Sequence, residues 1–275
     1  IFSWELVNEM NLIGASGNFY KTPVLAAWYK EIGEYLSQID PNDHMITGHY
    51  TILYDSDVFK LPQVDYVLTN AYYDVRGGNI VDYLKVVANF NARFNKPHFV
   101  SEYGGNWNAG PEALIEADLH NGIWAGCHLS FAATPLFWWH NFIEDKNLYF
   151  HYKALAEYMA GQDRLKEKLD PKQVKITGEN ETNIKSLCLA NQEKALIWVY
   201  GKDRLNKPPS DSDPVLTKNN QCLIEGLIPG DYVIEFWDTY AGKIVQTKIE
   251  KNEGSMSFLL PETNRDFAIK IYRKS

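Results

Sequence analysis

The feature that most constrains the fold of this chain is a change of pattern near residue 165. Before it, short apolar runs of β character alternate with stretches of helical spacing, whereas after about residue 170 only strand-like pieces follow one another between Gly, Asn, Pro and Asp. Alternating strands and helices are typical of parallel sheets. The sequence therefore predicts two domains, an α/β domain over residues 1–167 and an all-β domain over residues 168–275.

In the first domain, five apolar runs are expected to be strands, at residues 1–9, 44–50, 64–73, 96–105 and 133–142. Helical patterns fall at about residues 22–39, 80–94, 111–127 and 152–160. Thr22 is expected at the N-cap of the first helix, with Pro23 at its first position. No Gly-rich dinucleotide loop follows any of the strands, which favours a barrel over an open cofactor-binding sheet.

The second domain is expected to contain about eight short strands between residues 173 and 273, with turn residues between them. This spacing is typical of a β-sandwich. No acid pair or histidine cluster stands out in this part of the sequence, and Trp237 is expected in the core rather than on a sugar-binding surface.

Charge and composition exclude several classes of function. A net charge of −8 disfavours nucleic acid as a partner, and no apolar stretch reaches the length of a membrane span. Cys127, Cys188 and Cys222 are too scattered for a disulfide framework or a zinc cluster, so we expect them to pack as small apolar residues. His120 and His128 lie in a helical pattern and are expected to be structural. The sequence thus predicts neither a metal site nor a cofactor.

Polar side chains collect where the predicted strands of the first domain end. In a barrel of parallel strands, functional residues lie at the C-terminal ends of the strands. The residues concerned are Asn8-Glu9, His49-Tyr50, Asn70 with Tyr72, Glu102-Tyr103 and Trp138-Trp139-His140.

Glu9 and Glu102 form the best-placed pair of carboxylates, each closing a strongly apolar strand. Hydrolysis of a glycoside with retention needs two carboxyl groups about 5–5.5 Å apart. Asn8 can bind a sugar 2-hydroxyl, and Tyr72 can donate a hydrogen bond that keeps Glu102 ionised. We therefore expect Glu9 to be the acid/base and Glu102 the nucleophile. Glu5 shares the strand parity of Glu9 and is expected to be structural.

Several other residues are candidates for substrate binding. Trp138 and Trp139 alternate faces, so one of them should point into the pocket, and Trp139 is favoured. His49 and His140 are candidate sugar contacts, with hydrogen-bonded loop histidines as the alternative. Trp107 follows the strand of Glu102 and is expected either to line a subsite or to pack on a loop. For Tyr72, simple packing is the alternative.

Four motifs resemble, in this order, barrel strands 4, 6, 7 and 8 of the clan A glycoside hydrolases. They are WELVNE (residues 4–9), NAY (70–72), KPHFVSEYG (96–104) and PLFWWHN (135–141). The closest likeness is to family 5 and related (β/α)8 enzymes with a C-terminal β-sandwich. The resemblance implies that Glu9 is the acid/base and Glu102 the nucleophile, that Tyr72 orients this nucleophile, and that a Trp of the last motif forms the floor of a sugar subsite.

The sequence departs from this family in two ways. Asn70 stands where many members have His, which alters a hydrogen bond on the acid/base side. Strands 1 to 3, which in the family supply an Arg near the nucleophile, have no counterpart here. We therefore expect the chain to hold the C-terminal portion of the barrel, strands 4–8 only, and the natural protein to begin upstream. The open sheet edges would then be covered by the missing N-terminal half or by another chain.

The function predicted from the sequence is that of a retaining glycoside hydrolase. It would cleave β-glycosidic bonds of a poly- or oligosaccharide by double displacement, without a cofactor. The alternative is a non-catalytic carbohydrate-binding or scaffold protein derived from such a hydrolase, although a pure binder has no need of two facing carboxylates. A secreted or periplasmic location is expected, with carbohydrate rather than nucleic acid or membrane as the partner.

Overall fold

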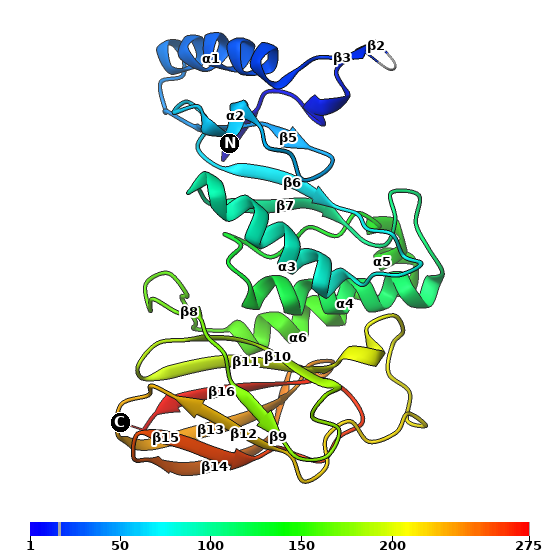
Figure 1. Ribbon diagram of the computed structural model, residues 1–275, viewed down its shortest axis with the longest axis vertical. Coiled ribbons are helices and arrows are strands. Elements are labelled where there is room, and N and C mark those ends of the chain that lie inside the picture. The colour runs from blue at the N-terminus through cyan, green and yellow to red at the C-terminus, as the bar shows by residue number, and fades with distance from the viewer. Residues whose placement is uncertain (16–17, 275) are drawn as a thin grey trace. The chain divides into compact units, whose positions relative to one another are not determined.

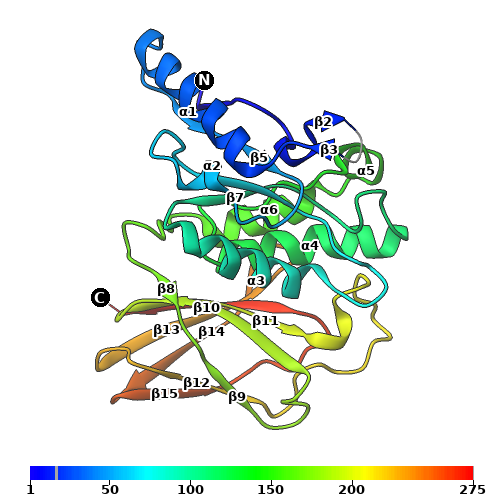
Figure 2. The same cartoon turned by 45° about the horizontal axis from the view of Figure 1, so that its top comes forward.

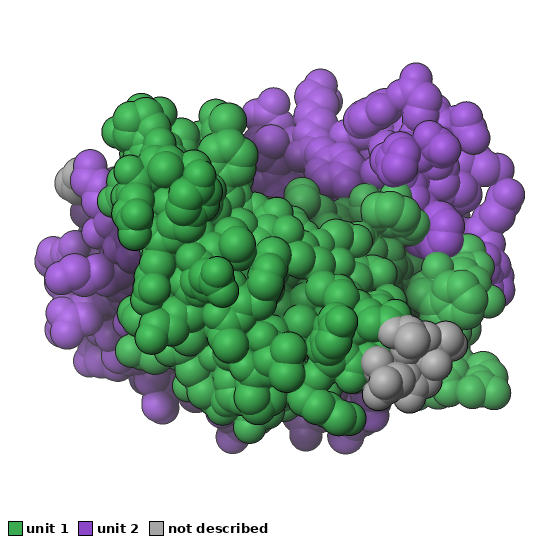
Figure 3. Space-filling model, turned by 90° about the horizontal axis from the view of Figure 1, so that it is seen from above, with its two compact units in different colours: residues 1–109, 131–138 green, residues 110–130, 139–275 purple. Residues whose placement is uncertain are grey.

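The computed structural model describes residues 1–15 and 18–274 and shows a mixed α/β chain. It divides into two compact units, which Figure 3 colours separately: Ile1–Ala109 with Phe131–Trp138, and Gly110–Ser130 with Trp139–Ser275. Each unit is built from segments that are discontinuous in sequence. The boundary predicted between residues 167 and 168 is not tested by this division and stays a prediction.

The first unit is built on short parallel strands. Strand β1 (Ser3–Glu5) pairs with β4 (Met45–Thr47), and β5 (His49–Tyr50), β6 (Val67–Ala71) and β7 (His98–Tyr103) lie next to one another in a parallel sheet (Figure 1). A parallel bridge from Tyr103 to Phe137 adds the next segment of the chain. The parallel pairing expected from the alternation of strands and helices is thus confirmed.

The connections of this unit contain helices α1 (Thr22–Ile39), α2 (Asp57–Lys60) and α3 (Ile80–Asn91), the 3-10 turns η1 (Met10–Leu12) and η2 (Ala92–Phe94), and the hairpin β2 (Gly14–Ala15) with β3 (Asn18–Phe19). Side-chain caps begin two of the helices, because Asn79 accepts from the backbone N–H of Asp82 and Ser56 from that of Val58. Helix α1 begins one residue earlier than expected, so Thr22 lies inside it and Lys21 occupies the cap position.

The segment 44–50, expected as one strand, is two strands that change partner at Gly48. A Cβ atom at this position would lie 2.2 Å from Cε of Met10 and 2.5 Å from Oη of Tyr29. Both of these side chains are fully buried in the core of the unit, together with Tyr50 and Phe59. Only glycine fits at this position, where the chain packs against the core between β4, which pairs with β1, and β5, which pairs with β6.

A β-bulge interrupts the pairing of β6 with β7. Thr69 lies opposite Val100, but Asn70 lies opposite Glu102, which leaves Ser101 as an extra residue on β7. Bulges break the strict alternation of side chains and are common beside functional sites. Ser101 and Glu102 can therefore both turn their side chains toward Asn70.

The second unit contains two antiparallel sheets that share one core (Figure 2). The larger sheet has the order β14-β13-β16-β11-β10-β8 and the smaller the order β15-β12-β9. Alternate residues of both, such as Ile197, Val199, Cys222 and Ile224, belong to this core. The strands are β8 (Asp170–Pro171), β9 (Lys175–Thr177), β10 (Ile184–Ala190), β11 (Lys194–Gly201), β12 (Gln221–Glu225), β13 (Gly230–Asp238), β14 (Lys243–Asn252), β15 (Ser255–Leu259) and β16 (Phe267–Arg273), and the 3-10 turn η3 (Lys202–Arg204) follows β11.

All eight strands expected between residues 173 and 273 are present, and β8 is additional. The unit also contains helices α4 (Glu112–His128), α5 (His140–Lys146) and α6 (Tyr149–Met159). The strand expected over 133–142 is reduced to a single bridge residue, Phe137, and α5 begins at His140. In the part of the chain that the structure describes, no helix combines the length and the apolar character needed to cross a membrane.

Candidate active site

The two predicted carboxylates lie together in the first unit, on either side of one amide. Glu9 follows β1, Asn70 lies in β6 and Glu102 in β7. The amide nitrogen Nδ2 of Asn70 donates to Oε1 of Glu9 at 3.3 Å and to Oε2 of Glu102 at 3.1 Å. Tyr72, two residues beyond Asn70, donates from its hydroxyl to the same Oε2 of Glu102 at 2.9 Å. The structure thus brings together four residues that the sequence singled out.

The shared amide limits the distance between the carboxylates. Since one nitrogen is 3.3 Å from an oxygen of Glu9 and 3.1 Å from an oxygen of Glu102, these two oxygens are at most the sum of those distances apart. Retaining glycosidases keep their carboxyl groups about 5–5.5 Å apart, and inverting enzymes about 6.5–9.5 Å apart. Because the bound concerns one pair of oxygens and not the two carboxyl groups as wholes, both arrangements are compatible with it.

Glu9 holds a strained backbone conformation. Its φ of 51° and ψ of 49° lie in the left-handed region, which costs a residue with a Cβ atom about 1–2 kcal/mol. Strand β1 ends at Glu5, and the strained turn at Glu9 leads into η1, where the backbone N–H of Leu12 donates to the carbonyl of Glu9 at 2.8 Å. Strain of this kind is concentrated at functional sites.

Tyr72 is a proton donor whose hydroxyl stays protonated. Burial raises its pKa well above the ordinary value, and the negative charge of Glu102, the hydrogen bond to it and the charge of Glu9 raise it further. Glu102 therefore accepts two hydrogen bonds at Oε2, one from the Tyr72 hydroxyl and one from the Asn70 amide.

His49 is buried next to Asn70 and faces the oxygen of that amide, whereas Glu9 and Glu102 face its nitrogen. Its side chain is 1% exposed, with Nδ1 2.6 Å from Oδ1 of Asn8 and Nε2 2.7 Å from Oδ1 of Asn70. The structure thus places His49 out of reach of a sugar, contrary to its expected role as a sugar contact. Asn8 is exposed and turns its amide oxygen to this histidine.

Ser101 belongs to the same group of residues, although nothing in the sequence predicts this. Its Oγ donates to Oδ1 of Asn70 at 3.0 Å and lies 2.9 Å from Nε2 of His49. As the neighbour of Glu102 on a regular strand, Ser101 would face the other side of the sheet. The β-bulge reverses this, and no local feature of the sequence signals it.

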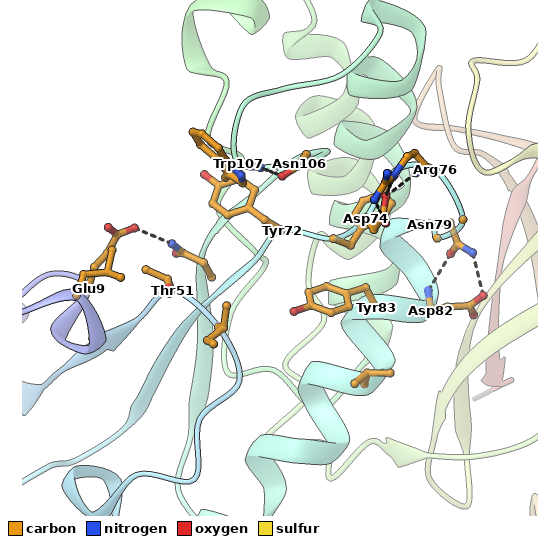
Figure 4. Close-up of a pocket in the computed structure, with 17 residues that line it drawn as sticks. Glu9, Thr51, Tyr72, Asp74, Arg76, Asn79, Asp82, Tyr83, Asn106 and Trp107 are labelled. Atoms are coloured by element: carbon orange, nitrogen blue, oxygen red, sulfur yellow. Dashed lines mark hydrogen bonds and ion pairs between the residues drawn. The ribbon is translucent and has the colours of Figure 1, made fainter. Parts of the chain in front are cut away.

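A cavity of about 1120 Å³ opens from this group of residues within the first unit. Glu9, Asn70 and Tyr72 line one part of it, and the segment after β6 and α3 line much of the rest, together with residues that follow β5 and β7 (Figure 4). Trp107, predicted as a subsite residue, lines the cavity with 73% of its surface exposed. The other lining residues are Leu12, Thr51, Ile52, Tyr73, Asp74, Arg76, Gly77, Gly78, Asn79, Asp82, Tyr83, Val86 and Asn106.

The remaining predicted residues do not line this cavity. Trp138 is 45% exposed, and its backbone N–H donates to the carbonyl of Tyr103 at 2.9 Å. Trp139 and His140 belong to the second unit, where Trp139 precedes α5 and His140 is the first residue of that helix. Over residues 1–15 and 18–274, no group of three or more His, Cys, Asp or Glu side chains is arranged to hold a metal ion.

Comparison with known proteins finds similarity in structure alone. No family model and no curated protein sequence matches the chain. Among solved structures, a protein described as a glycoside hydrolase aligns with a TM-score of 0.60 and 12% identity, over 89% of this chain and 61% of its own length. A family 5 glycoside hydrolase from Bacteroides vulgatus aligns with a TM-score of 0.57 and 12% identity, over 89% of this chain and 58% of its own length.

A family 30 subfamily 8 xylanase from Clostridium acetobutylicum aligns over all of this chain and 66% of its own length, with a TM-score of 0.54 and 10% identity. At these identities the likeness concerns the fold. The chain therefore has a fold like that of glycoside hydrolases and spans about three fifths of the length of the first two structures.

Proposed function

We propose that this chain carries the catalytic centre of a retaining glycoside hydrolase. Glu9 would be the acid/base and Glu102 the nucleophile, on strands that form the C-terminal part of a (β/α)8 barrel, followed by a β-sandwich. The observation that carries the proposal is the amide of Asn70, which holds both carboxylates within one hydrogen bond of a single nitrogen. The fold shared with glycoside hydrolases supports it.

The first step of the proposed reaction forms a covalent intermediate. An oxygen of Glu102 attacks the anomeric carbon while the bond to the leaving oxygen breaks, and the carboxyl group of Glu9 gives its proton to that oxygen. Because Tyr72 and Asn70 both donate to Oε2 of Glu102, we assign the attack to Oε1.

In the second step Glu9 acts as the base and Glu102 is the leaving group. The Glu9 carboxylate takes a proton from water, the water oxygen attacks the anomeric carbon, and the bond to Glu102 breaks. The two hydrogen bonds at Oε2 favour the departing carboxylate because charged acceptors form the stronger bonds. The products are the free sugar and the enzyme in its starting protonation state.

The cavity supports a neutral poly- or oligosaccharide as the substrate. Exposed Trp107 offers an apolar ring face on which a sugar can stack. The charged side chains in the lining are Glu9, Asp74 and Asp82 against Arg76 alone, whose guanidinium is bound by Asp74 at 2.8 Å. This excess of negative charge disfavours uronic acids. Such a substrate is compatible with the secreted or periplasmic location predicted above.

We also propose that further barrel strands, from another segment or another chain, cover one face of the first unit. Helix α1 exposes Val24, Trp28, Tyr35 and Ile39, and the segment around β1 exposes Ile1, Phe2 and Trp4. Among the described residues β1 pairs with β4 alone, so its other edge is open. A large exposed apolar patch beside an open strand edge is typical of a surface that another element covers.

The test is azide rescue of the full-length protein acting on aryl β-glycosides. Glu102→Ala should lose about 10⁴-fold or more in kcat. Azide should then restore turnover and give the inverted glycosyl azide, because it attacks from the face that the carboxylate has vacated. Glu9→Ala should give the azide of retained configuration, because azide displaces Glu102 from the covalent intermediate.

The stereochemistry of the two azides assigns the two roles independently. A loss of less than tenfold in Glu102→Ala would overturn its assignment as nucleophile. If the wild-type protein binds oligosaccharides but turns over none of a broad panel of β-glycosides, the non-catalytic carbohydrate-binding alternative holds instead.

A further inference from the structure

The hydrogen bonds of Asn70 leave its amide only one orientation. The side chain is 1% exposed, and its nitrogen faces the two carboxylates of Glu9 and Glu102, which accept hydrogen bonds. Its oxygen faces Nε2 of His49 and Oγ of Ser101. If the amide were turned over, its oxygen would face both carboxylates and two buried hydrogen bonds would be lost.

This orientation determines what Nε2 of His49 must do. The oxygen of Asn70, 2.7 Å away, can only accept, so the hydrogen bond requires a proton on Nε2. Ser101 fills the second acceptor site of that oxygen by donating its own hydroxyl proton at 3.0 Å. All four hydrogen-bonding positions of the Asn70 amide are then satisfied.

The other ring nitrogen also faces acceptors. Nδ1 of His49 lies 2.6 Å from Oδ1 of Asn8 and 3.5 Å from Oε1 of Glu5. An ionised carboxylate cannot donate, so Glu5 favours a proton on Nδ1 as well. A histidine that donates from both nitrogens carries a positive charge.

We propose that His49 is an imidazolium that acts as a positioning residue, locking the amide of Asn70 so that its nitrogen holds Glu9 and Glu102 in place. The proposal rests on the proposed function for its catalytic consequence, whereas the charge and the hydrogen bonds of His49 can be tested without it. The positive charge also lies near the carboxylate of Glu5 and interacts with that of Glu102.

The charged groups around His49 favour its protonated form. Burial disfavours the charged ring, but the hydrogen bond and charge of Glu5, the hydrogen bond of Asn70 and the charge of Glu102 outweigh it, so the pKa of His49 is raised. Glu5 comes from β1 and Glu102 from β7, and β6 contributes Asn70, which does not titrate. As the pH rises through this raised pKa the ring loses its positive charge, and the hydrogen bond to Asn70 is kept only by the neutral form that carries its proton on Nε2.

The protonation state can be measured directly by nitrogen NMR of the full chain labelled at histidine. The His49 ring should show protons on both nitrogens at pH 7 and should titrate above the ordinary value of 6.5. Comparison with His49→Gln assigns its signals among the seven histidines. A ring with one protonated nitrogen at pH 7 would overturn the proposal, whether or not the protein hydrolyses any glycoside.

The positioning role is tested with two substitutions of different character. His49→Gln keeps an N–H donor toward Asn70 without the charge, and His49→Leu keeps neither. We expect kcat to fall about 10- to 100-fold in His49→Leu and less in His49→Gln, with KM changed little. In His49→Gln, the pH profile of kcat/KM should shift to higher pH by roughly one unit, because a charge that favours ionised carboxylates is gone.

His44→Gln provides the matched control on the same stretch of chain. His44 pairs with Asp40 at 2.7 Å and does not line the cavity, so its loss should leave the pH profile unchanged. Equal profiles for His49→Gln and the wild type would overturn the positioning role. Absence of activity in the wild type would instead contradict the proposed function, and the NMR result would still decide the state of His49.

Discussion

Each of the two compact units buries a histidine beside a carboxylate, but the two clusters of polar side chains differ in what they connect to. In the first unit, His49 connects through Asn70 to the carboxylate of Glu9 at the edge of a cavity. In the second unit, His120 binds Asp266 at 2.9 Å, and Trp198 donates to the same carboxylate oxygen at 2.8 Å. Similar residue types therefore serve an open site in one unit and a closed structural contact in the other.

The second cluster is enclosed by aromatic rings. Tyr240 stacks on His120 with ring centroids 4.0 Å apart, and His151 lies with its Nδ1 3.0 Å from that of His120. Burial disfavours the charged form of Asp266, but the charge and hydrogen bond of His120 outweigh it, so its pKa is lowered. His120 and Trp198 thus both donate to the same oxygen of Asp266, which makes this carboxylate part of a buried structural network. The two clusters have similar residue types, so composition alone does not distinguish a substrate-binding site. What distinguishes it is a polar group that reaches a cavity large enough for a substrate.

The largest effect that separates the clusters is expected for Asp266→Ala. It leaves the buried donors of His120 and Trp198 without an acceptor, at ~1–3 kcal/mol each, so we expect a loss of about 3 kcal/mol in the free energy of unfolding measured with urea. Activity per folded molecule should be unchanged. Asp145→Ala, which removes an exposed carboxylate on α5, is the control and should change stability by less than about 0.5 kcal/mol. A loss of activity at full stability in Asp266→Ala would break the comparison.

His49 and two buried histidines of the second unit, His128 and His151, should also respond to pH in opposite directions. Burial lowers the pKa of His128 to about 4 and that of His151 to about 3, so the unfolded chain takes up protons first as the pH falls below 6.5. Each histidine then costs up to about 1.4 kcal/mol of stability per pH unit until its folded pKa is reached. The contribution of His49, whose pKa is raised, is instead present below pH 6.5 and lost as the pH rises through its folded pKa.

His128→Leu tests the acid side of this contrast. Nε2 of His128 has no hydrogen-bond partner within the described chain, so leucine removes a buried polar atom and the proton uptake linked to it. Urea unfolding between about pH 7 and pH 4.5 should show a shallower loss of stability than in the wild type, by roughly 1 kcal/mol per pH unit. An unchanged slope would show that this histidine is not neutral in the folded chain.

The smallest expected effect concerns the strained backbone of Glu9, which has no counterpart among the residues of the second cluster. Glu9→Asn should be more stable than Glu9→Gln by about 0.5 kcal/mol, because asparagine tolerates the left-handed region and glutamine does not. Both variants should be inactive toward unactivated glycosides. Equal unfolding free energies would indicate that the turn at Glu9 stores no strain.

Much of the site follows from the sequence because strand ends carry strong signals. Glu9, Asn70, Tyr72 and Glu102 each follow or close an apolar run, and parallel pairing brings such ends to one edge. Trp107 lies on the cavity, where a subsite residue would be, but loop packing was an equal alternative, and the roles assigned to all these residues stay predictions. The eight strands of the second unit follow from regular alternation and turn residues.

The features that escaped prediction depend on contacts between distant residues. The split at Gly48 comes from Met10 and Tyr29, whose side chains fill the space where a Cβ would lie. His49 looked like a sugar contact because it ends an apolar run, but the side chains of neighbouring strands bury it. Helix α5 was mistaken for the end of a strand, since a short apolar run does not distinguish the two.

The extra residue on β7 has a consequence for comparing relatives. Counting back from Glu102 by twos leads to Val100, but the register shift at Ser101 makes that parity misleading. A homologue without the insertion would need one residue fewer between its buried strand and its glutamate to present the same carboxylate. Alignments across such proteins should therefore allow a single-residue gap at this point, because a regular strand of unchanged length would turn Glu102 toward the opposite face.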